Sequence, residues 1–129
     1  PKFRDLLGED FTFEGVVYGK KKNELLKNSE VFLLPSFFEG LPMSLLESMS
    51  FGVVPVTTDV GSINLVVKNR ETGILVNKFS ADEIVSAIEE FIKDREFMRR
   101  LSQNARQIIM NNYTPERYVI ALNEIYKSG

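Results

Sequence analysis

Four short strand-like runs, three of them apolar and the first alternating before it becomes apolar, constrain the fold of this chain more than any other feature. The runs are Phe11–Val17, Val31–Leu34, Val53–Thr57 and Ile74–Val76. Short runs of this kind are typical of strands that are buried on both faces of a parallel sheet. The chain is therefore expected to form a sheet whose strands are joined by right-handed helical crossovers.

Helix-forming stretches lie between and after these runs. The spacing of apolar residues and the terminal signals predict helices over Lys21–Lys27, Pro42–Phe51 and Glu96–Met110, and a short turn over Ser62–Val67. This alternation predicts the α/β class, as a Rossmann-like open parallel sheet flanked by helices, within a single domain over residues 1–129. Ligands of such sheets bind beyond the carboxyl ends of the strands, so a site is expected at that edge.

Two further helix starts carry side-chain signals. Ser80-Ala81-Asp82-Glu83 has the pattern of a capping box, in which the Ser80 hydroxyl accepts from the Glu83 amide and the Glu83 carboxylate reaches back to Ser80. Thr114-Pro115 predicts the start of a last helix, whose apolar stripe contains Tyr118, Leu122 and Ile125. An exposed stripe of this kind predicts self-association through the C-terminal helix.

The composition excludes several kinds of chemistry. Among 129 residues there is no Cys and no His, so disulfides, thiolate nucleophiles, Ser-His-Asp triads and His-based metal sites are excluded. Lys and Arg number 16 against 18 Asp and Glu, and the net charge of −2 gives no support to a nucleic-acid surface. We expect a cytoplasmic location, because no apolar run has the length of a membrane span and the first residues lack the hydrophobic run of a signal peptide.

The segment 35–52 contains the clearest candidates for chemistry. It holds two carboxylates, Glu39 and Glu47, with Gly40 and Pro42 between them. The Gly and the Pro predict a loop around Glu39, followed by a helix that contains Glu47. The start of that helix would present unpaired backbone N–H groups and a partial positive charge, which suit a diphosphate. Because carboxylates accept hydrogen bonds from neighbouring hydroxyls, the pattern predicts a nucleotide-sugar site.

The same residues resemble the E-x7-E signature of group 1 glycosyltransferases. The resemblance is carried by Glu39-Gly40-Leu41-Pro42 and by residues 46–56, 59–62 and 72–76, and it covers nearly the whole chain. It implies a retaining enzyme with the GT-B fold, in which two Rossmann-like domains face a cleft. The chain is similar to part of the carboxyl-terminal, donor-binding domain of such an enzyme.

The resemblance implies a role for each matched position. Glu39 would contact hydroxyls of the transferred sugar and is the candidate catalytic residue, and Glu47 would hold the ribose hydroxyls of the donor nucleotide. The other donor-binding positions would supply backbone amides or lie near the nucleotide, and they are Gly40, Leu41, Pro42, Met43, Ser44, Leu45, Gly61 and Ser62. No metal and no cofactor is expected, because helix amides and basic side chains stabilise the leaving diphosphate in enzymes of this fold.

The implied reaction is retaining hexosyl transfer from a nucleotide-diphosphate sugar to a glycan or lipid-linked acceptor, in the biosynthesis of polysaccharides or glycoconjugates. The resemblance starts half way through the donor-binding domain. The amino-terminal domain and the Arg and Lys side chains that grip the donor phosphates would therefore be partners from elsewhere in the parent enzyme, which can lie peripherally on a membrane. The chain alone is expected to be inactive. One departure is Asn64-Leu65, where the family often has Pro-Glu.

A non-catalytic nucleotide-binding or interaction module is the alternative from another class. Such a module would share the fold and the sheet edge without performing the transfer. A dinucleotide-binding domain is a weaker alternative, because the sequence has no G-x-G-x-x-G motif after a strand. The interaction module and the glycosyltransferase therefore remain as the two hypotheses.

Overall fold

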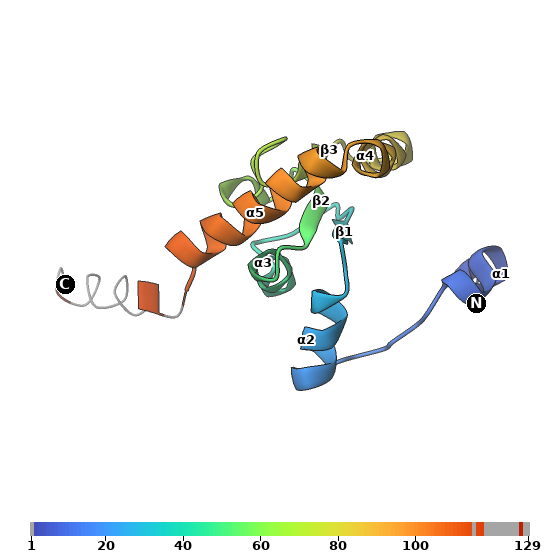
Figure 1. Ribbon diagram of the computed structural model, residues 1–129, viewed down its shortest axis with the longest axis horizontal. Helices are drawn as coiled ribbons and strands as arrows, with labels where there is room; N and C mark the ends of the chain where they lie inside the picture. The colour runs from blue at the N-terminus through green and yellow to red at the C-terminus, as the bar shows by residue number, and fades with distance from the viewer. Residues whose placement is uncertain (1, 115, 118–126, 128–129) are drawn as a thin grey trace.

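Three parallel strands form the centre of the protein in the computed structural model, which describes residues 2–114, 116–117 and 127 (Figure 1). The strands are β1 (Val31–Leu34), β2 (Val54–Thr58) and β3 (Ile74–Val76), and their order in the sheet is β1-β2-β3. The sheet confirms the predicted α/β class and three of the four predicted strands.

Helices connect the strands and flank the sheet. In chain order they are α1 (Lys2–Leu7), the 3-10 helix η1 (Gly8–Asp10), α2 (Gly19–Lys27), α3 (Met43–Ser50), the 3-10 helix η2 (Ile63–Leu65), α4 (Ala81–Lys93) and α5 (Arg95–Asn112). The predicted helices over segments 21–27, 42–51 and 96–110 are confirmed, with small differences at their ends. The stripe of the last predicted helix, with Tyr118, Leu122 and Ile125, lies outside the described residues, and so does the self-association surface predicted on it.

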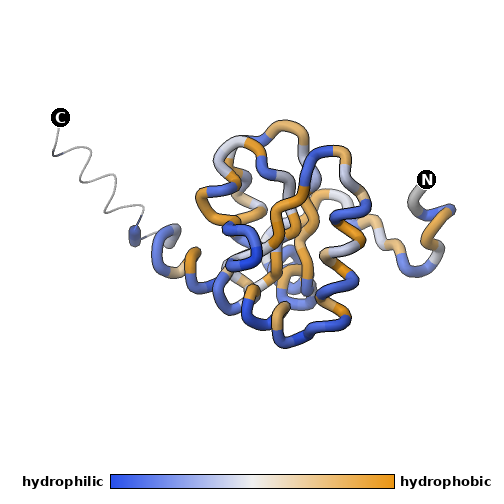
Figure 2. The backbone as a smooth tube through the Cα atoms, turned by 90° about the horizontal axis from the view of Figure 1, so that it is seen from above, coloured by the Kyte–Doolittle hydropathy of each residue, from blue (hydrophilic) through white to orange (hydrophobic). Residues whose placement is uncertain are grey.

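Each face of the sheet has its own hydrophobic core. Val54 and Val56 of β2 belong to a cluster with side chains of α4 and of the first half of α5. Phe32 and Leu34 of β1 pack against a second cluster, formed by α3, η2 and the second half of α5. Figure 2 shows hydrophobic strand segments at the centre and helices whose colour alternates between hydrophobic and hydrophilic. Burial on both faces explains the apolar sequence of β2, whereas β1 is only partly buried and its Leu33 is 47% exposed.

The predicted strand at Phe11–Val17 is wrong. This segment is an extended connection between η1 and α2, and it holds α1 apart from the rest of the protein (Figure 1). The side chains of Phe13 and Val16 are 76% and 79% exposed. The physical reason is that a strand needs a neighbour for its backbone hydrogen bonds, and within the described residues β1 pairs with β2 alone.

The predicted capping box at the start of α4 is half right. Ser80 is the N-cap, and its hydroxyl accepts a hydrogen bond from the Glu83 amide at 3.3 Å. The Glu83 carboxylate does not return to Ser80. It accepts instead from the backbone N–H of Asn77 at 2.6 Å and from the side-chain amide of Asn77 at 2.8 Å. The carboxylate thus ties the end of β3 to the first turn of α4.

Candidate functional site

The loops that follow the three strands meet at one edge of the sheet, as parallel strands require. Residues 35–42 follow β1 and lead into α3, residues 59–62 follow β2 and lead into η2, and residues 77–80 follow β3 and lead into α4. All candidate residues predicted from the sequence lie in the first two of these loops or in α3. The helix begins after Pro42, so Glu39 lies in the loop and Glu47 inside the helix, as predicted.

A chain of hydrogen bonds holds the Glu39 loop against β2. The hydroxyl of Thr58, at the end of β2, donates to the carbonyl oxygen of Ser36. The hydroxyl of Ser36 then donates to Oε1 of Glu39 at 2.9 Å. Thr58 is buried, with 2% of its surface exposed, so the first bond is protected from water. Glu39 is itself half-buried, and its second oxygen, Oε2, accepts no hydrogen bond from another described residue.

The turn after β2 lies directly against the same loop. Gly61 has a positive φ of +57°, and a Cβ atom at this position would lie 1.8 Å from the carbonyl oxygen of Glu39. The backbone N–H of Ser62 donates to the carbonyl oxygen of Gly40 at 3.1 Å. The structure therefore brings together Glu39, Gly40, Gly61 and Ser62, four of the positions singled out from the sequence.

The amino-terminal end of α3 presents fewer free amides than the sequence predicts. The carbonyl oxygen of Pro42 accepts from the amide of Leu45 at 3.1 Å and from that of Leu46 at 3.4 Å, so Leu45 does not offer a free N–H group. Met43 and Ser44 have amides without a backbone acceptor within the described residues. Both are exposed, and they lie at the positive end of the helix dipole.

The remaining predicted positions in this region contribute to packing. The Leu45 side chain is completely buried, together with Met49, and Leu41 packs against the same cluster. Pro42 is the N-cap of α3, with φ −70° and ψ 133°, and its ring supplies no N–H group. These side chains fix where α3 begins, and the groups available to a ligand are the exposed amides and the two carboxylates.

Glu47 lies in the second turn of α3 and forms an ion pair that the sequence does not predict. Oε2 of Glu47 is 2.6 Å from Nζ of Lys22, which comes from α2. Of its two neighbours in the helix, Leu46 is partly buried and Ser48 is completely buried. Glu47 therefore stands at the border between the core and the solvent, where one of its oxygens meets a charged partner.

Sequence reasoning missed three contributors to this region: Lys22, Ser36 and Thr58. The contacts of Lys22 and Thr58 join segments that are far apart in the sequence, so no local pattern points to them. Ser36 lies only three positions before Glu39, and this short spacing is an available signal. The hydroxyls at the end of β2 are another signal, because a Thr at the carboxyl end of a parallel strand lies near the ligand edge. Thr57, the neighbour of Thr58, has a buried hydroxyl without a partner in the described part of the protein.

Two grooves of the protein lie near the carboxyl ends of the strands. One, of about 480 Å³, runs between β3 and α4 and is lined by Arg70, Asn77, Glu83 and Glu90 among others. The other, of about 320 Å³, is lined by Phe37 and Phe79, whose rings are 4.7 Å apart between centroids. The second groove is also lined by Pro35 and Thr58, so it adjoins the Glu39 loop at the sheet edge, although neither Glu39 nor Glu47 lines either of these two grooves.

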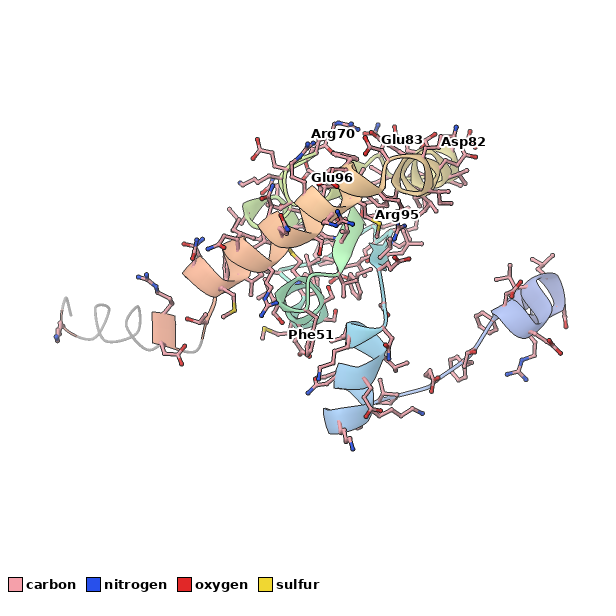
Figure 3. All side chains as sticks on the ribbon, in the orientation of Figure 1. Phe51, Arg70, Asp82, Glu83, Arg95 and Glu96 are labelled. Atoms are coloured by element: carbon pink, nitrogen blue, oxygen red, sulfur yellow. The ribbon has the colours of Figure 1, made fainter. Side chains whose placement is uncertain are left out.

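The groups with shifted pKa values belong to the first groove. Arg70 forms a bidentate ion pair with Glu90, at 2.6 Å and 3.0 Å, which raises the pKa of Arg70 and lowers the pKa of Glu90. The hydrogen bonds from Asn77 lower the pKa of Glu83. Figure 3 shows Arg70 and Glu83 on the side of the molecule opposite to Phe51, which ends α3. The interactions that cause these pKa shifts therefore stabilise α4, and they are not part of the candidate site.

The described part of the protein has neither a metal-binding cluster nor a membrane-spanning helix. No group of three or more Asp, Glu, His or Cys side chains in that part of the protein is placed to hold a metal ion. None of its helices is both long enough and apolar enough to cross a membrane.

Comparison with known proteins gives a consistent set of relatives. The family model described as glycosyl transferases group 1 matches residues 5–108. A UDP-Gal:alpha-D-GlcNAc-diphosphoundecaprenol alpha-1,3-galactosyltransferase from Escherichia coli is 30% identical over 102 residues, which are 79% of this chain and 26% of that protein. An N-acetyl-alpha-D-glucosaminyl L-malate synthase from Bacillus anthracis is 32% identical over 110 residues, 84% of this chain and 29% of that protein. The chain thus spans less than a third of the length of these relatives.

Solved structures with the same fold include a sucrose-phosphate synthase from Thermosynechococcus elongatus. It has a TM-score of 0.88 at 23% identity, covering 98% of this chain and 33% of that one. The Anabaena protein Alr3699/HepE in complex with UDP-glucose has a TM-score of 0.84 at 16% identity, covering 99% of this chain and 35% of that one. At these identities the likeness shows the fold, which is the Rossmann-like α/β arrangement of glycosyltransferase structures.

Proposed function

The chain belongs to the glycosyl transferases of group 1, and on that premise we propose that it is the donor-binding part of a retaining glycosyltransferase. The parent enzyme would transfer a hexosyl group from a nucleotide-diphosphate sugar to a glycan or lipid-linked acceptor. The E. coli and B. anthracis relatives support this proposal, because their names describe a galactosyltransferase acting on a diphosphoundecaprenol-linked sugar and an N-acetylglucosaminyl malate synthase.

One observation carries the proposal. The Glu39 loop is held by Ser36 and Gly61 at the end of α3 that exposes the amides of Met43 and Ser44. An acidic side chain beside free helix amides offers acceptors for hydroxyl groups and donors for an anion within one short segment. A sugar joined to a diphosphate presents these two kinds of group next to each other.

We assign each of these groups to one part of the donor molecule. Glu47 accepts hydrogen bonds from the ribose hydroxyls, and Glu39 accepts from hydroxyls of the transferred sugar. The amides of Met43 and Ser44, at the positive end of α3, stabilise the charge on the diphosphate. Gly61 and Ser62 lie near the nucleotide and fix the backbone of Gly40.

The proposed reaction needs no metal ion. The bond between the anomeric carbon and the diphosphate breaks, and the acceptor hydroxyl attacks the carbon on the face from which the diphosphate departs, so configuration is retained. The acceptor proton passes to the leaving diphosphate, whose negative charge the α3 amides stabilise. We propose that this chain alone does not perform the transfer, because the acceptor and further phosphate contacts come from other parts of the parent enzyme.

The alternative function, an interaction module, is favoured by the segment before α2. Phe13, Val16 and Tyr18 expose 76%, 79% and 78% of their surfaces. Clustered exposed apolar side chains of this kind mark contact surfaces. Within the proposed function this surface contacts the rest of the parent polypeptide, such as its acceptor-binding domain, and it leaves the edge with Glu39 and Glu47 free for the donor.

An NMR titration of the 129-residue chain with UDP, GDP, ADP and their common sugar conjugates tests the proposal. Several solved structures with this fold contain UDP or UDP-glucose, so UDP is the first ligand to use. We expect amide shifts in residues 36–47 and 57–62 with one of the nucleotides. Shifts confined to the groove between β3 and α4, or no shift with any of the ligands, would contradict donor binding at this edge.

A further inference from the structure

An ion pair joins α2 to the candidate site. Nζ of Lys22 lies 2.6 Å from Oε2 of Glu47, and the two side chains are 36% and 37% exposed. Each partner is therefore partly covered by protein, so solvent and salt screen this pair less than a pair with both heads in open water. The backbone of Glu47 is fixed, because Leu45 and Met49 on the same helix are completely buried.

The ion pair occupies one side of the Glu47 carboxylate. Oε2 faces the ammonium group of Lys22, whereas Oε1 accepts no hydrogen bond from any residue that the structure describes. An ionised carboxylate has about four lone-pair sites, so this arrangement leaves Oε1 able to accept from a ligand hydroxyl. The orientation of that free oxygen is set by the ammonium group on the other side.

We propose that Lys22 is a positioning residue, which holds Glu47 in the rotamer that accepts the ribose hydroxyls of the donor nucleotide. This inference rests on the proposed function, which gives Glu47 its ribose role. A free Glu side chain in the second turn of a helix samples several rotamers, and ribose binding must then order it at an entropic cost. With Lys22 in place, the Glu47 side chain is already ordered before the nucleotide binds.

The neighbours of Lys22 provide matched controls. Lys20 and Lys21 belong to the same run of three lysines at the start of α2. Nζ of Lys21 lies 2.7 Å from Glu14, in the segment before the helix, and Nζ of Lys20 lies 4.0 Å from Glu24, within the helix. A change at Lys21 therefore removes the same charge from the same helix turn without touching Glu47.

Isothermal titration with pairs of nucleotides tests the inference on the full 129-residue chain. The ligands are UDP, GDP and ADP, each compared with its 2′,3′-dideoxy counterpart. Lys22→Met should weaken binding of the ribonucleotide by about twofold to fivefold, the range expected from one ordered ion pair. The dideoxy nucleotide should bind the variant and the wild type equally well. Lys22→Arg should restore ribonucleotide binding, Lys21→Met should leave it unchanged, and Lys22→Met should have no further effect in a Glu47→Gln background.

Three results would overturn the inference while the proposed function stands. Tighter ribonucleotide binding by Lys22→Met would mean that Lys22 competes with the ribose for Glu47. An equal loss of affinity for the dideoxy nucleotide in Lys22→Met would mean that Lys22 contacts the phosphates or the base. An affinity equal to that of the wild type would mean that the ion pair does not order Glu47. Circular dichroism of each variant checks that the fold is kept.

Failure of the proposed function gives a different result. The wild-type chain would then bind none of the three nucleotides, or it would bind ribonucleotide and dideoxynucleotide with equal affinity. Either result removes the ribose role of Glu47, and the positioning role of Lys22 falls with it.

Discussion

Gly61 packs its α-carbon directly against the peptide carbonyl of Glu39. A Cβ atom at Gly61 would lie 1.8 Å from that oxygen, and the φ angle of +57° is one that residues with a side chain rarely adopt. The turn after β2 is thus the support on which the Glu39 loop is built. Glycine is required there for two independent reasons, the backbone conformation and the lack of space.

Gly61→Ala should lower the free energy of unfolding by more than about 2 kcal/mol, because a left-handed alanine and a displaced loop both cost energy. Gly8→Ala is the matched control, since Gly8 has the same φ of +57° and nothing within 4 Å of the added Cβ. Gly8→Ala should lower the free energy of unfolding by about 1 kcal/mol. Chemical denaturation measures both variants, and equal losses would mean that the contact with Glu39 contributes nothing.

The two threonines at the end of β2 provide a second matched pair. Thr58→Val removes the hydroxyl that donates to Ser36 and should lower the free energy of unfolding by about 1–2 kcal/mol. Thr57→Val removes a buried hydroxyl that has no partner among the described residues, so it should be neutral or stabilising by up to about 1 kcal/mol. Thermal and chemical unfolding test this order. A larger loss for Thr57→Val than for Thr58→Val would contradict the assignment.

The sequence predicts the parts of the fold that rest on local patterns. β1 and β3 have the predicted bounds, because Val31–Leu34 and Ile74–Val76 are continuous apolar runs that pair with β2. Phe11–Val17 alternates apolar and polar residues before its last two valines, but it has no neighbouring strand in the described structure, and propensity alone does not hold a strand together. The carboxylate of Glu83 accepts from two donors of Asn77, one at each oxygen, instead of returning to Ser80, and this choice of partner depends on how β3 and α4 meet.

The candidate site also has features that the sequence predicts and features that it does not. The loop position of Glu39 and the helical position of Glu47 follow from Gly40 and Pro42, so both could be predicted. The packing of Gly61 on Glu39 and the ion pair between Lys22 and Glu47 join distant segments, and their geometry depends on how α2, α3 and β2 assemble. Tertiary contacts of this kind leave no periodic signal in the sequence.

The stability of α4 should depend on pH through Glu83. Its pKa is lowered in the folded state by hydrogen bonds from Asn77, so the contribution is fully present above the unfolded value of about 4.3 and is lost as the pH falls through the folded pKa. The difference in unfolding free energy between wild type and Glu83→Gln should therefore shrink between about pH 6 and pH 3. Asn77→Ala, which keeps the backbone donor, should retain part of the dependence. A difference that does not vary with pH would contradict this role.

The two carboxylates of the site should affect different parts of the donor. Glu47→Gln should weaken the binding of UDP and of UDP-glucose alike, by about 1.5–3 kcal/mol, because both ligands contain the ribose. Glu39→Gln should leave UDP binding unchanged and reduce the additional affinity that the glucose provides. Titration calorimetry of both variants with both ligands measures the split. The opposite pattern would exchange the two roles, and equal effects on sugar and nucleotide would reject the division.

A crystal structure of the chain soaked with a nucleotide-diphosphate sugar tests the central claim most directly. The account predicts density for the ribose hydroxyls within hydrogen-bond distance of Glu47, for the diphosphate at the amides of Met43 and Ser44, and for the sugar at Glu39. Density for the nucleotide in the groove between β3 and α4, lined by Arg70 and Glu90, would contradict the account, because neither Glu39 nor Glu47 lines that groove.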